Sequence, residues 1–499
     1  MGVVNASSIK LVCFGQDTII IDAAIHRFHG RLSRLPNYAT DYKINPMNHT
    51  LQAIETIEVH ISSDDVKLTH SVNESYTISI NEYSSLVVIE SENVFGALYA
   101  LETLGQLLEF GWLDGEGDDA VYVIRNIPIG IEDFPRYEYR GLLIDTSRHF
   151  LPLDLILANL DAMLMNKINV LHWHMTDSQS FPYLIESMPE LAVKGAYHPK
   201  MVYTRKDIQR VIHEAYLRGI RVIPEVDMPG HTQSIAASRP DLMSCCPHPS
   251  DPLDPTNPKV YDFIRDIYQD LRNVFVDDFV HVGGDEVDLS CWDNSKDIVH
   301  WRQQHNISSS VGLFELFETQ LLEIVEKVGR TPIVWQEVFN LNLTLTATTI
   351  IDVWKGFDTK TMSDATRRGF KVILSGCWYL DHLTLDWQNF YSCNPSNFTG
   401  RTDLLLGGHA SMWGEHVDAS NFISRIYPRV SAMAERLWTG DISIAKENVR
   451  QRISDFRCRM VQQGFAAQPI GPGFCAHEVP YQSCKTGDRI PSTTLQLEL

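Results

Sequence analysis

The sequence lacks the features of a membrane protein and of an export leader. It contains no apolar run of about 18 residues, the length that a helix needs to span a bilayer. The first seven residues, Met1 to Ser7, lack the basic start and apolar core of a signal peptide. Ala6 stands where N-myristoylation requires Ser or Thr. We therefore expect no membrane span and, if the protein is exported, a processed or truncated chain.

Basic residues are also scarce. The 499 residues include 42 basic and 63 acidic ones, which gives a formal net charge of −21. Nucleic-acid binding needs a basic surface that replaces the counterions of the phosphates, so nucleic acid is excluded as a partner. The excess of carboxylates suggests a protein that works at acidic pH, where partial protonation relieves their repulsion. An activity optimum above neutral pH would contradict this hypothesis.

The nine cysteines form no CxxC array, which argues against a cysteine-built zinc site. Most of them fall in loop-like segments, where disulfides fit better, and the odd number leaves at least one thiol unpaired within the chain. Disulfides and glycosylation sequons together favour an exported protein over a cytosolic one with scattered thiols. The predicted glycosylation sites are Asn5, Asn48, Asn73, Asn306, Asn342 and Asn397.

The pattern of the chain changes near residue 135. Before this point, residues 56–62 and 76–80 alternate like strands, residues 94–108 have helical spacing, and residues 111–119 form a Gly/Asp-rich loop or hairpin. Pro128 and Pro135 then interrupt the chain. We predict a smaller α/β domain over residues 1–135 and a larger catalytic domain, with a C-terminal extension, over residues 136–499.

After residue 135, eight short apolar runs recur with helical segments between most of them. This alternation is typical of buried parallel strands joined by helices, and eight such units predict a (β/α)8 TIM barrel. An open doubly wound sheet would place a glycine-rich phosphate turn after its first strand, and residues 145–149 contain no glycine. The predicted strands are 141–144, 168–174, 221–226, 279–282, 333–335, 350–354, 371–374 and 404–406.

Acids and tryptophans gather where the predicted strands end, which is the edge of a barrel that carries the active site. Indole faces stack on the C–H surfaces of sugar rings, and carboxylates accept hydrogen bonds from hydroxyls. One tryptophan at a strand end is usually part of the core, whereas three or more beside acids favour a carbohydrate site. Examples are Asp145, Asp177, Glu225, Trp335, Trp354, Asp381 and Trp413.

The fourth predicted strand leads into Gly283-Gly284-Asp285-Glu286. Glycoside cleavage usually needs two carboxyl groups that flank the scissile bond. Neighbouring residues on a strand point to opposite sides, so Asp285 and Glu286 are not expected to flank one anomeric carbon. A substrate that carries its own nucleophile, the oxygen of a 2-acetamido group, resolves this difficulty. Glu286 would then be the acid and base, and Asp285 would hold the acetamido N–H. A solvated helix start is the structural alternative for such an acidic pair.

Seven motifs in order resemble the family-20 β-N-acetylhexosaminidases, most closely the eukaryotic lysosomal and secreted type. The resemblance covers roughly residues 20–478 and implies an N-terminal α/β domain, a catalytic barrel, and retaining, substrate-assisted release of terminal β-linked GlcNAc or GalNAc through an oxazolinium intermediate. It implies no cofactor and no metal. The motifs are at residues 145–149, 172–183, 229–231, 281–287, 335–338, 378–381 and 413–415.

The resemblance also implies roles for individual residues. Glu286 is expected to be the acid/base and Asp285 to orient the acetamido group, whose oxygen Tyr379 would bind. Asp177 and His231 would support Glu286 through hydrogen bonds and tune its pKa. The residues expected to wall the sugar or bind its hydroxyls are Arg148, Trp335, Trp354, Asp381, Trp413 and Glu415.

Asp381 occupies the position that discriminates neutral from anionic sugars in the resembling family. Its carboxylate should accept a 6-hydroxyl and repel a 6-sulfate, so we predict weak activity on 6-sulfated substrates. His382, when protonated, could soften that repulsion.

Two cysteine pairs match disulfides of the family, Cys246 with Cys291 and Cys458 with Cys475. A bridge between Cys377 and Cys393 is a further candidate, which would brace the loop that carries Tyr379. The pairing of Cys13, Cys245 and Cys484 stays open. From the resemblance we also expect a homodimer, located in the lysosome or outside the cell, that acts on glycans or chitooligosaccharides.

Three other functions make different demands on the sequence. His172 and His174 alternate on a strand and so share a face, where they could bind zinc with Asp177 and His231. A non-catalytic glycan-binding protein on the same fold would have lost Glu286 or Tyr379, which are both present. A chitinase of family 18 would carry the run DxxDxDxE on a barrel strand, and the chain has none.

Overall fold

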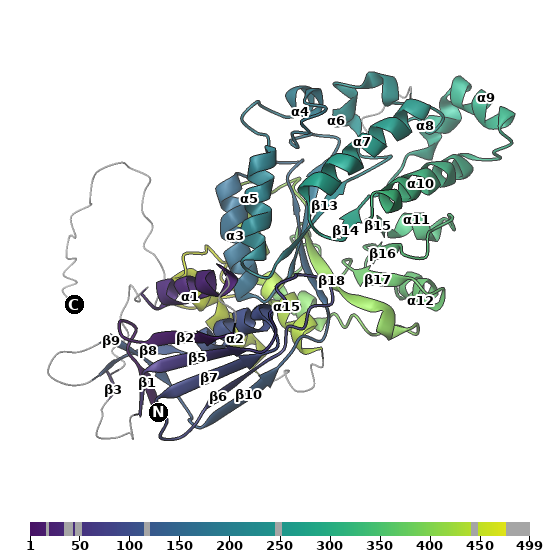
Figure 1. Ribbon diagram of the computed structural model, residues 1–499. Coiled ribbons are helices and arrows are strands. Elements are labelled where there is room, and N and C mark those ends of the chain that lie inside the picture. The colour runs from purple at the N-terminus through teal and green to yellow at the C-terminus, as the bar shows by residue number, and fades with distance from the viewer. Residues whose placement is uncertain are drawn as a thin grey trace, which may run out of the picture.

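The computed structural model describes residues 1–15, 19–33, 43–44, 52–113, 120–244, 252–440 and 448–475. They form two five-stranded sheets and a closed eight-stranded barrel. In Figure 1 the N-terminal sheets lie to one side of the barrel. Helices α1 (Ile19–Leu32) and α2 (Val94–Leu107) lie beside these sheets, on the side that faces the barrel. The predicted combination of an α/β region and a TIM barrel is confirmed.

Both N-terminal sheets combine parallel and antiparallel strand pairs. The first has the order β3-β8-β9-β1-β4, with mixed pairing. The second has the order β10-β6-β7-β5-β2, and its strands β2, β5 and β7 are parallel. The strands are β1 (Gly2–Val4), β2 (Lys10–Phe14), β3 (Lys43–Ile44), β4 (Gln52–Ile54), β5 (Thr56–Ile61), β6 (Tyr76–Ile80), β7 (Leu86–Ser91), β8 (Glu109–Leu113), β9 (Ala120–Ile124) and β10 (Ile129–Asp133).

Alternation of apolar and polar residues explains why the second sheet has one covered face. In β6, Tyr76, Ile78 and Ile80 are buried, whereas Thr77 and Ser79 are partly exposed. The buried face packs on α1 and α2, whose apolar residues join the same core as Leu164 and Leu217 of the barrel region. The opposite face is turned away from the barrel.

The barrel consists of eight parallel strands that pair in chain order, and β18 closes the barrel against β11. Their residues are buried almost throughout, which accounts for the continuous apolar runs. One inward layer takes an apolar residue from each strand, from Tyr139 to Leu406. The strands are β11 (Tyr139–Asp145), β12 (Val170–Thr176), β13 (Arg221–Val226), β14 (Phe279–His281), β15 (Thr331–Trp335), β16 (Ile350–Val353), β17 (Lys371–Leu374) and β18 (Leu405–Met412).

The helices around the barrel begin where the sequence provides caps. Thr204 forms a capping box with Asp207 at the start of α5, and Asn257 precedes Pro258 at the start of α7. The main helices are α3 (Leu153–Met165), α5 (Arg205–Tyr216), α7 (Pro258–Val274), α9 (Lys296–Gln304), α10 (Ser310–Lys327), α12 (Thr359–Arg367), α15 (Arg429–Thr439) and α17 (Val449–Gln462). Shorter helices are α4 (Glu190–Gly195), α6 (Gln233–Ala236), α8 (Leu289–Asn294), α11 (Gln336–Asn340), α13 (Trp387–Ser392) and α14 (Phe422–Ile426).

Two predicted elements need correction. The apolar spacing of residues 425–438 predicts a single closing helix, but the structure has two, α14 and α15, because Pro428 between them has no backbone N–H to continue the first. Strand β18 extends to Met412, well beyond the predicted end at residue 406. Gly407 and Gly408 hid this extension, and Gly407 is required because a Cβ there would lie 2.0 Å from the carbonyl oxygen of Tyr139.

Covalent and ionic links fasten the parts together. The structure contains the disulfides Cys377–Cys393 and Cys458–Cys475, both proposed from the sequence. Cys291 is also disulfide-bonded, and its expected partner Cys246 lies outside the described residues, as do Cys245 and Cys484. The buried Arg140 of the barrel donates two hydrogen bonds to Glu74 of the N-terminal region. Among the described helices, none is long and apolar enough to cross a bilayer.

Candidate active site

The predicted acidic pair lies on a loop with unusual backbone geometry after β14. Gly283 and Gly284 have φ values of +78° and +97°, which only glycine adopts readily. A Cβ on Gly283 would lie 1.6 Å from Asp227 Oδ1, so the loop also needs glycine to fit against the neighbouring strand. Glu286 has a φ of +51°, a conformation uncommon for a residue with a side chain. The loop is therefore held in a constrained shape, as is typical of functional sites.

Asp285 and Glu286 differ in their surroundings. Asp285 is buried, and its Oδ1 has no hydrogen-bond partner among the described residues. The side chain of Glu286 is 59% exposed. His231 lies between them, with its Nε2 3.7 Å from Asp285 Oδ2 and 3.6 Å from Glu286 Oε2. These are ion-pair distances and too long for the predicted hydrogen bond to Glu286.

His231 belongs to a chain of alternating charges. Its Nδ1 lies 3.2 Å from Asp177 Oδ1, and Asp177 Oδ2 lies 2.8 Å from Arg148 Nη2 and 2.9 Å from His174 Nε2. Burial alone would lower the pKa of His231, but the charge of Asp285 and the hydrogen bond with Asp177 raise it to about 9. Burial alone would raise the pKa of Asp177, but His174, His231 and Arg148 hold it well below its usual range. Asp177 therefore stays ionised and His231 stays cationic at neutral and acidic pH.

Two further carboxyl groups, from the end of β13, lie next to these charged side chains. Glu225 lies within 3.2 Å of ring nitrogens of three histidines and accepts a hydrogen bond of 2.9 Å from Trp335 Nε1. Burial would raise its pKa, but these histidines hold the pKa well below its usual range. Asp227 accepts the backbone N–H of Gly284 at 3.0 Å. Burial and the neighbouring carboxylates, Asp285 first, raise the pKa of Asp227 well above its usual range, so Asp227 is a neutral acid.

Aromatic side chains gather beside the acids. The ring centroids of Trp354 and Tyr379 are 6.0 Å apart and nearly parallel, and those of Trp335 and Trp413 are 6.1 Å apart. Trp354 Nε1 donates to Glu337 Oε2 at 2.8 Å, which fixes the indole. Burial raises the pKa of Tyr379 well above its usual range, so its hydroxyl keeps its proton and can donate. The structure thus brings together the four predicted aromatic residues.

The remaining predicted residues lie around the same rim. The Arg148 guanidinium is 5.1 Å from the ring centre of Trp413, and its Nε has no hydrogen-bond partner among the described residues. Glu415 is exposed. Burial alone would lower the pKa of Arg148, but the charges of Asp145, Asp177 and Glu415 raise it. Asp381 is half-buried, and its Oδ1 is another buried acceptor that has no partner among the described residues. Burial raises the pKa of Asp381 in spite of the neighbouring His382.

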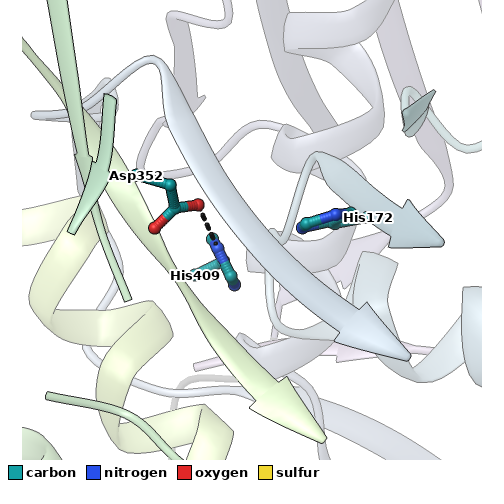
Figure 2. Close-up of side chains that lie close together, drawn as sticks. All are labelled: His172, Asp352 and His409. Atoms are coloured by element: carbon teal, nitrogen blue, oxygen red, sulfur yellow. Dashed lines mark hydrogen bonds and ion pairs between the residues drawn. The ribbon is translucent and has the colours of Figure 1, made fainter. Parts of the chain in front are cut away.

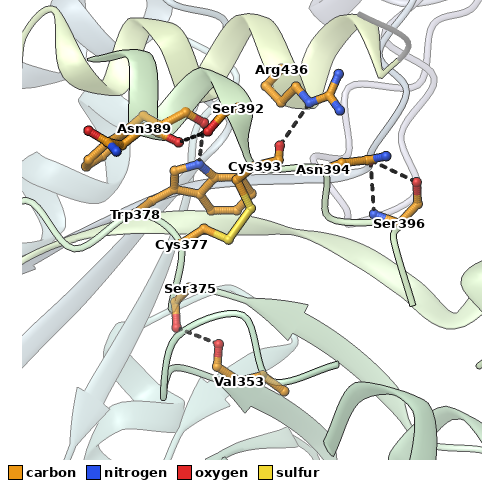
Figure 3. The surroundings of a disulfide bond; sticks show 11 residues. Val353, Ser375, Cys377, Trp378, Asn389, Ser392, Cys393, Asn394, Ser396 and Arg436 are labelled. Carbon is orange, nitrogen blue, oxygen red and sulfur yellow. Dashed lines mark hydrogen bonds between the residues drawn. A yellow bond between two sulfur atoms is a disulfide. The ribbon is translucent and has the colours of Figure 1, made fainter. Parts of the chain in front are cut away.

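The loop that carries Tyr379 and Asp381 is fastened at its base. Figure 3 shows the disulfide between Cys377 and Cys393 beside Trp378, whose Nε1 donates to the carbonyl of Phe390 at 3.0 Å. The guanidinium of Arg436 donates to the carbonyl of Cys393 at 2.9 Å. Tyr379 also forms an isolated bridge with Ser411 of β18. These contacts give the loop a defined position relative to the barrel.

The histidines on β12 do not have the character of zinc ligands. His172 and His174 share a face, as predicted, but both lie against Glu225. Burial would lower the pKa of His174, but Glu225 and Asp177 raise it to about 10, and a protonated imidazole has no lone pair for a metal. Figure 2 shows His172 beside Asp352 and His409, whose Nε2 lies 2.7 Å from Asp352 Oδ2. Hydrogen bonding accounts for this pair without an ion.

Glu225 and Asp227 follow one another closely at the end of the third predicted strand, which places both at the rim, but the sequence assigns them no role. Sequence reasoning did not single out His281 or Glu337 within their motifs, or Glu318, which lies on α10 behind the loop. Glu318 is fully buried, and a Cβ on Gly284 would be 3.4 Å from its Oε1. The helical spacing of Glu318 with Phe314, Leu321 and Leu322 was the available signal, because it places this acid on the buried face of the helix.

Comparisons with known proteins agree with this geometry. Residues 137–441 match the model of the "Glycosyl hydrolase family 20, catalytic domain", and residues 4–107 match one described as "beta-acetyl hexosaminidase like". The beta-hexosaminidase subunit beta of Homo sapiens is 39% identical over 93% of this chain and 84% of that protein. The subunit alpha of Bos taurus is 42% identical over 81% of this chain and 78% of that protein. The solved chitobiase of Flavobacterium johnsoniae has a TM-score of 0.77 at 27% identity, covering 92% of this chain and 70% of that one.

Proposed function

The chain belongs to glycosyl hydrolase family 20, and we propose that Glu286 and Asp285 divide the catalytic work between them. The enzyme is an exo-acting β-N-acetylhexosaminidase, which releases terminal β-linked GlcNAc or GalNAc with retention of configuration. The similarity to enzymes over most of the chain favours this activity over a non-catalytic glycan-binding protein on the same fold.

The observation that carries the division of roles is the contrast between the two side chains. The exposed carboxyl group of Glu286 can reach a leaving oxygen, whereas Asp285 offers a buried acceptor, Oδ1, without a partner among the described residues. A buried acceptor gains from a donor, and the N–H of a 2-acetamido group supplies one. Within the acidic pair only Glu286 is exposed, so the pair does not supply a second carboxylate as nucleophile, and the proposed nucleophile is the acetamido oxygen of the substrate.

In the first step the acetamido oxygen attacks the anomeric carbon while the glycosidic C–O bond breaks. Glu286 gives its proton to the departing oxygen, and the sugar becomes a cyclic oxazolinium ion. Asp285 accepts the N–H and stabilises the positive charge, and the hydroxyl of Tyr379 donates to the acetamido oxygen. In the second step water attacks the anomeric carbon and gives a proton to Glu286. The oxazolinium ring opens, which restores the acetamido group and releases the free sugar.

The charged side chains around His231 support both steps of this reaction. A cationic His231 lies between Asp285 and Glu286, and Asp177 holds the imidazole in place. The proposed role of His231 is therefore to keep a positive charge beside both catalytic acids during the two steps.

The sugar would stand among the aromatic side chains. Trp335, Trp354 and Trp413 surround the space next to Tyr379, where their faces can contact the C–H surfaces of the ring. Unpartnered polar atoms of Arg148 and Asp381 are available to the ring hydroxyls, and Glu415 is exposed nearby.

The test compares Glu286→Gln and Asp285→Asn on two substrates, an alkyl N-acetylglucosaminide and a dinitrophenyl one. Loss of the general acid should lower kcat by about 10²–10⁴-fold on the alkyl glycoside, and by much less on the dinitrophenyl glycoside in the first step, because dinitrophenolate leaves without a proton. Asp285→Asn should lower the rate on both. Glu323→Gln, an exposed change on α10, is the control. Wild-type rates in both site variants would refute the assignment.

The assembly of the chain is a second proposal. The relatives are named as subunits, so we propose that the chain pairs with a second copy, which sedimentation of the purified protein tests.

The location and the domain boundary are also proposed. Disulfides and sequons support a lysosomal or secreted location, and fractionation of cells that produce the protein tests it. The division near residue 135 fits between β10 and β11, and limited proteolysis there tests it.

A further inference from the structure

A hollow of about 580 Å³ lies at one end of the second N-terminal sheet, away from the active site. It is found where β2, β5 and β7 end. The ends of parallel strands are a common place for ligand sites in open sheets, and the volume is in the range of about 300–1,000 Å³ usual for such sites.

The hollow has the chemistry of a sugar-binding surface. The ring of Phe14 stacks on His60 at a centroid distance of 4.6 Å, and Phe14 and Phe134 are 45% and 61% exposed. Carboxylates of Glu90, Glu92 and Glu132 line the same hollow. Exposed aromatic faces contact sugar C–H surfaces, and carboxylates accept hydroxyl hydrogen bonds.

Asn73, of the sequon Asn73-Glu74-Ser75, stands at the rim with its amide fixed. Its Oδ1 accepts the backbone N–H of Ser75 at 3.0 Å, and its carbonyl accepts Asn93 Nδ2 at 2.6 Å. Its Nδ2 donates to Glu92 Oε2. Ser75 and Glu92 both line the hollow, so the atom to which a glycan attaches lies directly beside it.

We propose that Asn73 carries an N-linked glycan whose first sugars lie in this hollow, against Phe14 and Phe134. In the attachment, an oligosaccharide moves from a lipid pyrophosphate donor to Nδ2. The C–N bond forms, the sugar–phosphate bond breaks, and the amide loses one proton while the lipid pyrophosphate departs. The substituted nitrogen keeps one hydrogen, so the bond to Glu92 can persist and direct the sugar.

The location distinguishes Asn73 from the other sequons. Asn5, Asn306, Asn342 and Asn397 are exposed as well, and Asn48 lies outside the described residues. None of these four exposed asparagines lines this hollow. A glycan on Asn73 would cover exposed aromatic surface of the N-terminal region, whereas a glycan on Asn306 would extend from the turn before α10.

The test uses the full chain, secreted from a eukaryotic host behind a heterologous leader. Glycopeptide mass spectrometry follows the rate at which an endoglycosidase releases the glycans of Asn73 and Asn306, before and after denaturation. In the native protein we expect release at Asn73 to be about tenfold slower, equivalent to about 1.4 kcal/mol of contact, and the rates to become equal after denaturation.

Variants separate the hollow from its surroundings. Phe14→Ser and Phe134→Ser should each speed release at Asn73 without changing hydrolysis of an aryl N-acetylglucosaminide, which reports correct folding. Tyr83→Ser is the matched control, because Tyr83 is an exposed aromatic residue, 82% accessible, in the turn at the other end of β6 and β7. An unoccupied Asn73, or equal native release rates at Asn73 and Asn306, would overturn the proposal.

Discussion

Buried acids on the two sides of the loop Gly283–Glu286 have opposite charge states. We call the side of His231 the front of the loop, and the side of Asp227 and Glu318 the back. In front, Asp177 is ionised and lies against three cationic side chains, His174, His231 and Arg148. Behind, Asp227 and Glu318 have pKa values well above their usual ranges, and burial is the first cause for both. Asp177 is thus balanced by charge, whereas Asp227 and Glu318 are neutral.

This difference follows from the cost of burying charge. An ionised carboxylate without a partner is strongly disfavoured in the interior, so it either pairs with a cation or keeps its proton. Cations behind the loop would compete with His231 for Asp285 and Glu286. Neutral acids support the loop without adding charge to the site, and Asp227 does so through the N–H of Gly284. The comparison predicts that neutral replacements are tolerated behind the loop.

Substitution of Asp227 gives the largest expected effect. Asp227→Asn keeps an oxygen for the N–H of Gly284 and, like the neutral acid, carries no charge, so kcat should stay within about tenfold of wild type. Asp227→Ala removes this contact, and the displaced loop should lower kcat by about 100-fold, or about 2.7 kcal/mol. Initial rates on an aryl N-acetylglucosaminide measure both. If Asn proved as harmful as Ala, Asp227 would have to act as an anion.

Glu318→Gln tests the second neutral acid through stability. Its folded pKa is raised, so the unfolded state loses this proton first, and wild-type stability falls as pH rises above about 4.3. Between about pH 4.3 and the raised folded pKa, each pH unit should lower the free energy of unfolding by up to about 1.4 kcal/mol, a loss that Gln removes. Unfolding temperatures of wild type and variant at pH 5.0 and 6.5 measure the difference. The exposed Glu323→Gln on the same helix is the control. A gap between Glu318→Gln and wild type that stays constant with pH would show that Glu318 is ionised in the fold.

Much of this arrangement is readable from the sequence, because parallel barrel strands leave continuous apolar runs. The predicted ranges 221–226 and 371–374 coincide with β13 and β17. Prediction failed where the reason for a residue is tertiary. Two neighbouring glycines, Gly407 and Gly408, are typical of a loop, yet they lie in β18. Glycine is needed at Gly407 because Tyr139 of the adjacent strand leaves no room for a side chain.

The same limit applies to the site. Motif spacing placed Asp285, Glu286 and His231 near one another, because the carboxyl ends of barrel strands share one edge. It did not show that Glu225 lies against three histidines or that Asp227 is neutral, since both depend on burial between strands. Nor did it reveal the long distances from His231 to the catalytic acids or the positive φ values of His231 and Glu286.

Asp381 is the intermediate case and gives the smallest expected effect. It faces the site, like the acids in front, but burial raises its pKa in spite of His382, a backbone hydrogen bond and Arg429, which oppose that shift. At pH 7 its negative charge should disfavour a 6-sulfate by about 1 kcal/mol, so Asp381→Asn should improve kcat/KM for a 6-sulfated aryl glycoside, relative to the unsulfated one, by about fivefold. The raised pKa means that Asp381 takes up a proton at a higher pH than an ordinary aspartate, so this gain should shrink as the assay is made acidic. Asp403→Asn, an exposed change outside the site, is the control. Equal efficiency of the wild-type enzyme on both substrates at pH 7 would place Asp381 with the neutral acids behind the loop.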